Sequence, residues 1–273
     1  LFGFNRDNTD GDPFEIMPFV VKATVDAQLI ITRKSGTGNV RFKYIIFRGD
    51  GTILDFNQGT GTAIAHANAA GAMSVGAALY LNTPAFGVNP PTVATFSSRG
   101  GILVNGANRG KPDFVAPNGE NTTGDFGAPS VDNDNLPNFY GTSAAAPHAG
   151  AATALILEAR KRHYNGELLN GTQVRSLWQS TAVDMDAPGY DVNTGYGFIQ
   201  TDKALLTFAN PIPQVVDMEL QDSAYIPGTD PVSVVITGEY FSNNASVVFQ
   251  YDTIPATVTN NGTQIVANIP AFL

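Results

Sequence analysis

A long apolar segment in the middle of the chain constrains its fold most strongly. Residues 144–162 are almost wholly apolar and rich in alanine, up to the charged end Glu158-Ala159-Arg160-Lys161-Arg162. A helix that is apolar on all sides belongs inside a domain. Cations in its last turn suit the negative end of the helix dipole. The segment therefore predicts an internal helix over 144–162.

The segments on either side of this helix indicate an α/β layer. Residues 72–80 form a continuous run of small apolar side chains, which is typical of a strand buried on both faces in a parallel sheet. Residues 172–179 predict a second helix with Thr172 as its N-cap and an apolar face formed by Val174, Leu177 and Trp178. Because helices and buried strands alternate, we expect an α/β domain over residues 61–209.

The two flanking regions have the patterns of β structure. In residues 1–60, short β-type runs at 19–23, 27–32 and 40–47 are separated by turn residues, which predicts an antiparallel β region. In residues 210–273, runs at 232–237, 245–250 and 263–269 have the spacing of an Ig-like sandwich. Pro211-Ile212-Pro213 is a stiff linker into this last region. The predicted domains are thus 1–60, 61–209 and 210–273.

Composition excludes several classes of protein. Hydrophobic residues make up 43% of the 273 residues, which is enough for a core and argues against global disorder. The formal charge is −9, from 24 acidic and 15 basic residues, so nucleic acid is a poor partner. There is no cysteine, which removes disulfides, thiolate metal sites and a cysteine nucleophile. No apolar stretch approaches the ~18 residues of a membrane span.

A serine stands where the internal helix begins, in Gly141-Thr142-Ser143. Free N–H groups and the helix dipole at such a position favour negative charge on a substrate oxygen. Ala144 to Ala146 keep the helix slim, and Pro147 falls in the first turn, where its missing N–H costs little. The same residues also suit a simple helix cap, and by themselves they do not decide between a cap and a nucleophile.

The whole stretch from Gly141 to His148 resembles the nucleophile motif of the subtilase family, Gly-Thr-Ser-x-Ala-x-Pro-His. Three further segments resemble family motifs in the same order: 95–100, 111–119 and, after the serine helix, 173–182 with 194–199. In the second of these, Asn118 is inserted before the glycine of Lys-Pro-Asp-x-x-Ala-Pro-Gly. The resemblance covers about residues 61–209. It implies a doubly wound, mainly parallel sheet and peptide-bond hydrolysis by an Asp-His-Ser triad with Ser143 as nucleophile.

The other triad members are missing from the pattern. The family's Asp-x-Gly and His-Gly-Thr segments are absent, and its oxyanion asparagine lies upstream of the matched region. His148 is five residues beyond Ser143 on the same helix, poorly placed for a hydrogen bond to its Oγ. We expect His66 to be a packing or turn residue and His163 to be solvated. The backbone N–H of Ser143 is then the only oxyanion donor expected from this chain.

Candidate aspartates fit no better. Asp10 precedes a glycine, but no buried strand comes before it. Asp132 and Asp134 lie in the polar loop 131–138, which is a surface excursion, a substrate edge or a calcium site.

Two hypotheses account for the missing triad residues. In the first, the chain is the C-terminal part of a longer protease, with 1–60 as the end of an inserted β domain. In the second, it is a catalytically dead binding or structural protein. We favour the first and expect this chain alone to be inactive.

Residues 236–241 and 265–271 resemble segments of the IPT/TIG group of Ig-like modules, which suggests a truncated module that acts as a spacer or adhesive appendage. Tyr240 and Phe241 are expected in its core.

Taken together, the resemblances imply a secreted or cell-surface bacterial serine endopeptidase with polypeptide substrates. No cofactor is expected for the chemistry, and structural calcium cannot be assigned to any residues. The sequence leaves the oligomeric state open.

Overall fold

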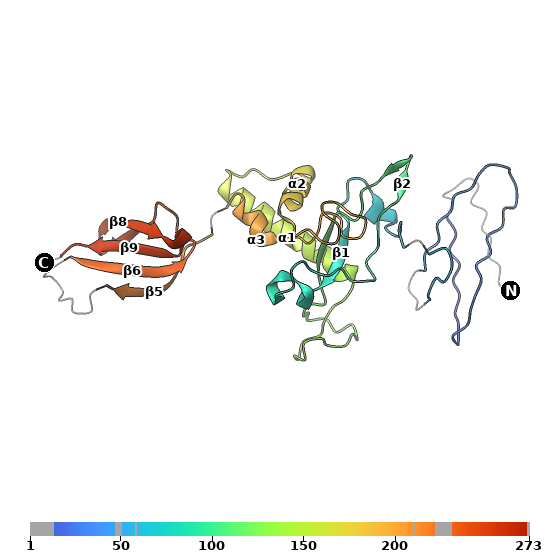
Figure 1. The fold of residues 1–273 in the computed structure, drawn as a ribbon, viewed down its shortest axis with the longest axis horizontal. Helices are drawn as coiled ribbons and strands as arrows, with labels where there is room; N and C mark the ends of the chain where they lie inside the picture. The colour runs from blue at the N-terminus through green and yellow to red at the C-terminus, as the bar shows by residue number, and fades with distance from the viewer. Residues whose placement is uncertain (1–13, 47–50, 58, 210, 222–230, 272–273) are drawn as a thin grey trace. The chain divides into compact units, whose positions relative to one another are not determined.

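The computed structural model describes residues 14–46, 51–57, 59–209, 211–221 and 231–271 (Figure 1). The chain divides into two compact units, Leu1–Gly51 and Thr52–Leu273. The second unit holds the α/β region, with helices and parallel strands, and a separate C-terminal antiparallel sheet. Each of these has its own buried hydrophobic cluster. The part of the chain that the structure describes has no helix with the length and apolarity of a membrane span.

The antiparallel strands predicted within residues 1–60 do not form in the described part of that region. Residues 14–46 and 51–57 contain no strand, and residue 47, the last of the predicted run 40–47, lies outside the described residues. The side chains that were expected to pack remain exposed: Val20 is 90% exposed, Ile30 66% and Phe42 63%. An alternating apolar pattern makes a strand only when a neighbouring strand pairs with it and its apolar face is covered.

The α/β region is built on two parallel strands and one long helix. β1 (Val75–Leu79) and β4 (Phe114–Asn118) pair in register from Val75↔Phe114 to Leu79↔Asn118. α1 (Thr142–His163) packs against both strands. A parallel bridge between Val115 and Phe198 extends this layer by one segment. The predicted buried strand is confirmed, and the layer is α/β as expected. The predicted helix also forms, but it is not internal: within α1 only Ala144, Ala145, Ala152 and Ile156 are buried, and Leu155 is 56% exposed. Its alanine-rich sequence packs one face on the strands and leaves the other face exposed.

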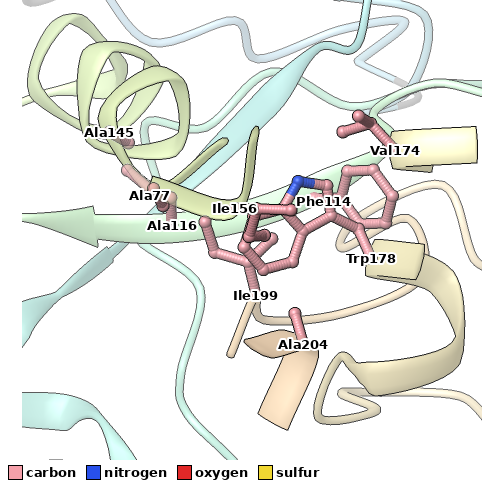
Figure 2. Close-up of a cluster of buried hydrophobic side chains, with 10 residues drawn as sticks. Ala77, Phe114, Ala116, Ala145, Ile156, Val174, Trp178, Ile199 and Ala204 are labelled. Carbon is pink, nitrogen blue, oxygen red and sulfur yellow. The ribbon is translucent and has the colours of Figure 1, made fainter. Parts of the chain in front are cut away.

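The core of this region lies between α1, the strands and two shorter helices, α2 (Gly171–Thr181) and α3 (Thr201–Leu206). The ring of Trp178 lies among Phe114, Ile156 and Val174 (Figure 2). Its indole N–H donates to Thr153 Oγ1 at 3.3 Å, so the polar atom of this buried side chain has a partner. Small residues on the strands, such as Ala77 and Ala116, let the helix approach closely.

The start of α2 differs from the prediction. Its N-cap is Asn170, and Thr172 is already inside the helix. Asn170 Oδ1 accepts the backbone N–H of Gln173 at 3.0 Å, and Gln173 Oε1 accepts that of Asn170 at 2.9 Å. This reciprocal capping box satisfies two helix-end donors at once, whereas a cap at Thr172 would satisfy one.

Shorter elements connect this framework. They are the 3-10 helices η1 (Ala65–Asn68), η2 (Tyr80–Asn82) and η3 (Pro84–Phe86) and the two-residue strands β2 (Leu103–Val104) and β3 (Ala107–Asn108), which pair with each other in antiparallel fashion.

The C-terminal residues form one antiparallel sheet of five strands in the order β5-β6-β9-β8-β7. The strands are β5 (Gln214–Leu220), β6 (Val232–Glu239), β7 (Ser246–Phe249), β8 (Asp252–Thr259) and β9 (Gln264–Ile269), with the 3-10 turn η4 (Asn260–Gly262) between the last two. The sheet curls around a cluster that includes Val234, Ile254 and Ile265.

Three of these strands match the predicted runs, and two were missed. β6, β7 and β9 confirm the runs at 232–237, 245–250 and 263–269. β5 begins directly after the predicted linker and is exposed along its whole length, so its side chains show no burial pattern. β8 contains Pro255, which weakens a strand pattern. Phe241 is buried as expected, but Tyr240 is 49% exposed, which corrects its assignment to the core.

Candidate active site

Ser143 lies at the carboxyl edge of the parallel strands. It is the second residue of α1 and its side chain is exposed. Asn118, the last residue of β4, accepts the backbone N–H of Gly141 through its Oδ1 at 3.2 Å, which joins the strand end to the helix start. In open α/β sheets, ligands bind outside the carboxyl ends of the strands. The serine is therefore presented where such a fold places its chemistry.

The turn before Ser143 depends on Gly141. Its φ of 105° and ψ of 171° lie in a region that side chains with a Cβ rarely adopt. Its carbonyl accepts the N–H groups of Ala144 and Ala145 at 2.9 and 3.2 Å, so it begins the helix. The N–H of Ser143 belongs to the first turn, whose amides have no acceptor within a helix, and it is suited to donate to a negatively charged oxygen.

No described histidine forms a hydrogen bond with Ser143. His148 Nδ1 lies 3.1 Å from Glu120 Oε1, although this contact lacks hydrogen-bond geometry, and both side chains are partly exposed. His66 is in the exposed 3-10 turn η1, so it is a turn residue and not a packing residue. His163 ends α1 and is exposed, as expected. The described chain therefore offers Ser143 no general base.

Of the three candidate aspartates, Asp10 lies outside the described residues. Asp132 and Asp134 lie in the segment between β4 and α1. Asp132 accepts the phenolic O–H of Tyr80 through its Oδ2 at 2.5 Å. This hydrogen bond raises the pKa of Tyr80 to about 12 and holds the pKa of Asp132 below its ordinary value. Asp134 accepts the side-chain N–H of Asn121 at 2.5 Å.

The segment 119–140 is organised by a buried asparagine that sequence analysis did not single out. Asn138 is fully buried, and its Nδ2 donates to Gly119 O and to Asn121 Oδ1, both at 2.9 Å. Its Nδ2 also lies 3.4 Å from Asp132 Oδ2. Among the described residues, no three His, Asp or Glu side chains gather as a metal site would require. The side-chain partners of Asp132 are neutral: the hydroxyl groups of Tyr80 and Ser130 and the amide of Asn138.

The Lys-Pro-Asp segment forms a buried ionic network at the other end of β4. Asp113 is 2% exposed and Lys111 1%, and Lys111 Nζ lies 2.7 Å from Asp113 Oδ2. Arg175 Nη1 from α2 lies 3.0 Å from the second oxygen, Oδ1. The backbone N–H of Ser74, just before β1, also donates to Asp113 at 2.8 Å. These residues hold the strands and α2 together and lie at the end of the strands opposite Ser143.

Two other motif segments also serve the fold. Ser97 Oγ accepts the N–H of Ala77 at 2.9 Å, which supports β1 on the edge that does not pair with β4. At Gly195, with φ +67°, a Cβ would lie 2.2 Å from Asp113 O, so only glycine fits there. Ser97, Asp113 and Gly195, which belong to these motif segments, therefore position the strands that lead to Ser143.

These features define an α/β protein in which a small parallel layer presents an exposed serine at a helix N-terminus. The sequence model of the subtilase family matches residues 26–197, which is more than half of the chain. The chain therefore belongs to the subtilase family, a family of serine endopeptidases. The match begins inside the region that we assigned to an inserted β domain.

Individual relatives match over part of their length. Fervidolysin of Fervidobacterium pennivorans is 32% identical over 128 residues, which are 44% of this chain and 16% of fervidolysin. A solved lanthipeptide protease is 27% identical over 49% of this chain and 40% of its own, with a TM-score of 0.35. The CspB protease of Clostridium perfringens is 27% identical over 51% and 27% of the two chains, with a TM-score of 0.37. The chain thus spans less than half the length of each.

Proposed function

We propose that the chain is the C-terminal part of a secreted serine endopeptidase in which Ser143 is the nucleophile. The observation that carries this proposal is the exposed Ser143 in the first turn of α1, at the carboxyl edge of β1 and β4. Membership of the subtilase family supports the same assignment.

In the proposed reaction, Ser143 Oγ attacks the carbonyl carbon of a peptide bond and its proton passes to a histidine outside this chain. An aspartate, also outside the chain, orients that histidine. The negative charge that forms on the carbonyl oxygen is stabilised by the Ser143 N–H and the positive end of the α1 dipole. The C–N bond then breaks, the histidine returns the proton to the leaving amine, and water hydrolyses the acyl-enzyme. This chemistry requires no cofactor.

Polypeptides are the proposed substrates, and the loop 131–138 is the proposed edge for them. This loop lies within the segment 119–140, whose two ends lie against each other, since Gly119 N–H donates to Phe139 O at 2.9 Å. For the C-terminal sheet we propose an IPT/TIG-like, Ig-type module that acts as a spacer or adhesive appendage. A single curled antiparallel sheet with an apolar core is consistent with part of such a module. A structural calcium ion remains unassigned to any residues.

The alternative is a catalytically dead subtilase-like protein that binds without cleaving. The observation that favours it is the lack of a histidine or aspartate bonded to Ser143 among the described residues. The complete open reading frame separates the two hypotheses. Upstream Asp-x-Gly and His-Gly-Thr segments support the protease, and their absence supports the binding protein.

A fluorophosphonate probe tests the nucleophile in the full-length protein. We expect labelling that Ser143→Ala abolishes and that Ser98→Ala, at an exposed serine of another motif, leaves intact. Labelling that survives Ser143→Ala would overturn the assignment.

The 273-residue chain alone should not cleave casein. Cleavage by it that Ser143→Ala abolishes would show that the chain contains a complete site.

A further inference from the structure

The buried side chain of Asn118 uses only one of its two polar atoms in a hydrogen bond. It is 1% exposed, and its Oδ1 accepts the Gly141 N–H at 3.2 Å. Its Nδ2 is buried and has no hydrogen-bond partner. Buried amide groups are normally fully paired, and an exception calls for an explanation. Asn118 is also an insertion relative to the family motif, because it separates Pro117 from Gly119 where the motif reads Ala-Pro-Gly.

The orientation of this amide is fixed by its one bond. If the amide were turned over, its NH₂ would face the Gly141 N–H, and two donors would oppose each other. The acceptor must therefore face Gly141, and the unpaired Nδ2 is the consequence. The fold keeps the hydrogen bond to the turn before Ser143 at the expense of a buried donor.

The bond acts on the turn that sets the position of Ser143. Gly141 is held through its N–H by Asn118 and through its carbonyl by Ala144 and Ala145. The next residue on the strand side, Gly119, is clamped as well, because a Cβ there would lie 2.7 Å from Leu79 and 3.0 Å from Tyr140. Two neighbouring contacts thus join the end of β4 to the start of α1: the hydrogen bond from Gly141 to Asn118 and the packing of Tyr140 on Gly119.

We propose that Asn118 is a positioning residue that fixes the Gly141 turn and thereby the Oγ and N–H of Ser143. This inference rests on the proposed function of Ser143 as nucleophile. Because Asn118 is buried, it does not touch the substrate and acts only through the turn. Its loss affects the orientation of the reacting groups more than substrate binding, since a displacement of about 1 Å can cost ~100-fold in rate.

The test uses the full-length protease and a peptide substrate. Asn118→Ala should lower kcat by roughly 10- to 100-fold, with KM changed by less than about 3-fold. The rate constant for fluorophosphonate inactivation should fall in parallel. Thr194→Val is the matched control, because Thr194 is also fully buried and donates to Asp191 at 2.6 Å near the opposite end of β4. It should lower the Tm without lowering kcat.

Asn118→Asp gives a second measurement that does not depend on Asn118→Ala folding. The introduced carboxyl keeps an acceptor for the Gly141 N–H in both of its protonation states. The kcat of Asn118→Asp should therefore stay close to that of the wild type, whereas Asn118→Leu, which has a similar volume and no acceptor, should lower kcat as Asn118→Ala does. A purely structural role predicts changes in Tm and the same kcat for both variants.

The outcomes separate this inference from the proposed function. If Ser143→Ala abolishes labelling but kcat of Asn118→Ala equals that of Thr194→Val, or kcat of Asn118→Asp equals that of Asn118→Leu, the positioning role is wrong and the nucleophile stands. If labelling survives Ser143→Ala, the proposed function itself fails, whatever Asn118 does.

Discussion

Arg175 Nη1 lies 3.0 Å from Asp113 Oδ1, which ties α2 to the start of β4. A second guanidinium nitrogen, Nη2, donates to Ala72 O at 3.0 Å, so the same side chain also reaches the segment before β1. Lys111 takes the other oxygen of Asp113. One buried carboxylate therefore connects both strands and the helix that closes the core.

Removal of this carboxylate should destabilise the fold strongly. Asp113→Ala leaves the buried ammonium of Lys111 without its partner, and we expect a loss of about 3–5 kcal/mol in the free energy of unfolding. Urea denaturation followed by the fluorescence of Trp178, the single tryptophan, measures it. Glu158→Gln is the control, because it breaks an exposed pair with Arg162 and should cost less than about 1 kcal/mol. Equal losses would contradict the structural role of Asp113.

Gly195 should tolerate no side chain. Gly195→Ala brings a Cβ to 2.2 Å from Asp113 O at a φ of +67°, so both a backbone clash and an unfavourable dihedral angle destabilise the variant. Gly189→Ala has a similar φ of +81° but no atom within 4 Å, and it should cost only about 1 kcal/mol. The difference between their Tm values measures the clash. A Gly195→Ala variant as stable as Gly189→Ala would show that the two segments do not pack this closely.

The N-terminus of α2 provides a direct comparison between sequence and structure. Asn170→Ala removes the cap and should cost about 1 kcal/mol of stability. Thr172→Ala, at the N-cap expected from sequence, should cost clearly less because Thr172 is exposed and lies within the helix. Chemical denaturation of the two variants tests the assignment, and the reverse order would restore Thr172 as the cap.

The Tyr80–Asp132 hydrogen bond should be visible in a phenol titration. Wild type minus Tyr80→Phe, followed by phenolate absorbance, should show one tyrosine with a pKa of about 12. Asp132→Asn should return that pKa toward its ordinary value of 10.0, whereas Asp134→Asn, which removes a weaker and purely coulombic contribution, should lower it less. A titration unchanged by Asp132→Asn would contradict the hydrogen bond.

The same pair gives the sign of a pH dependence. The raised pKa of Tyr80 means that its contribution to stability is complete below pH 10 and is lost as pH rises from about 10 to 12. The lowered pKa of Asp132 means that its contribution is present above the ordinary value of 3.8 and is lost as pH falls below it. Asp132→Asn should weaken both dependences in Tm measurements across these pH ranges.

Sequence patterns predicted the elements that are continuous apolar runs. The strand at 75–79 and most of the helix at 142–163 are such runs, so their types follow from local composition, although the helix buries only part of its surface. The β runs at 19–23 and 27–32 have similar patterns but form no strand, because strand formation depends on pairing partners that a local pattern does not contain. β5 was missed for the related reason that all its residues are exposed.

For the candidate site, the sequence by itself determined the family motif around Ser143 and the helix that presents it. It also showed that the motif's usual histidine and aspartate segments are absent from these 273 residues. Only the tertiary structure decided that Asn118 holds Gly141 and that Asp113 joins Lys111 and Arg175. Two of these contacts, Asn118–Gly141 and Asp113–Arg175, join residues 23 and 62 positions apart in the chain, and such pairs meet only after the strands and helices have packed.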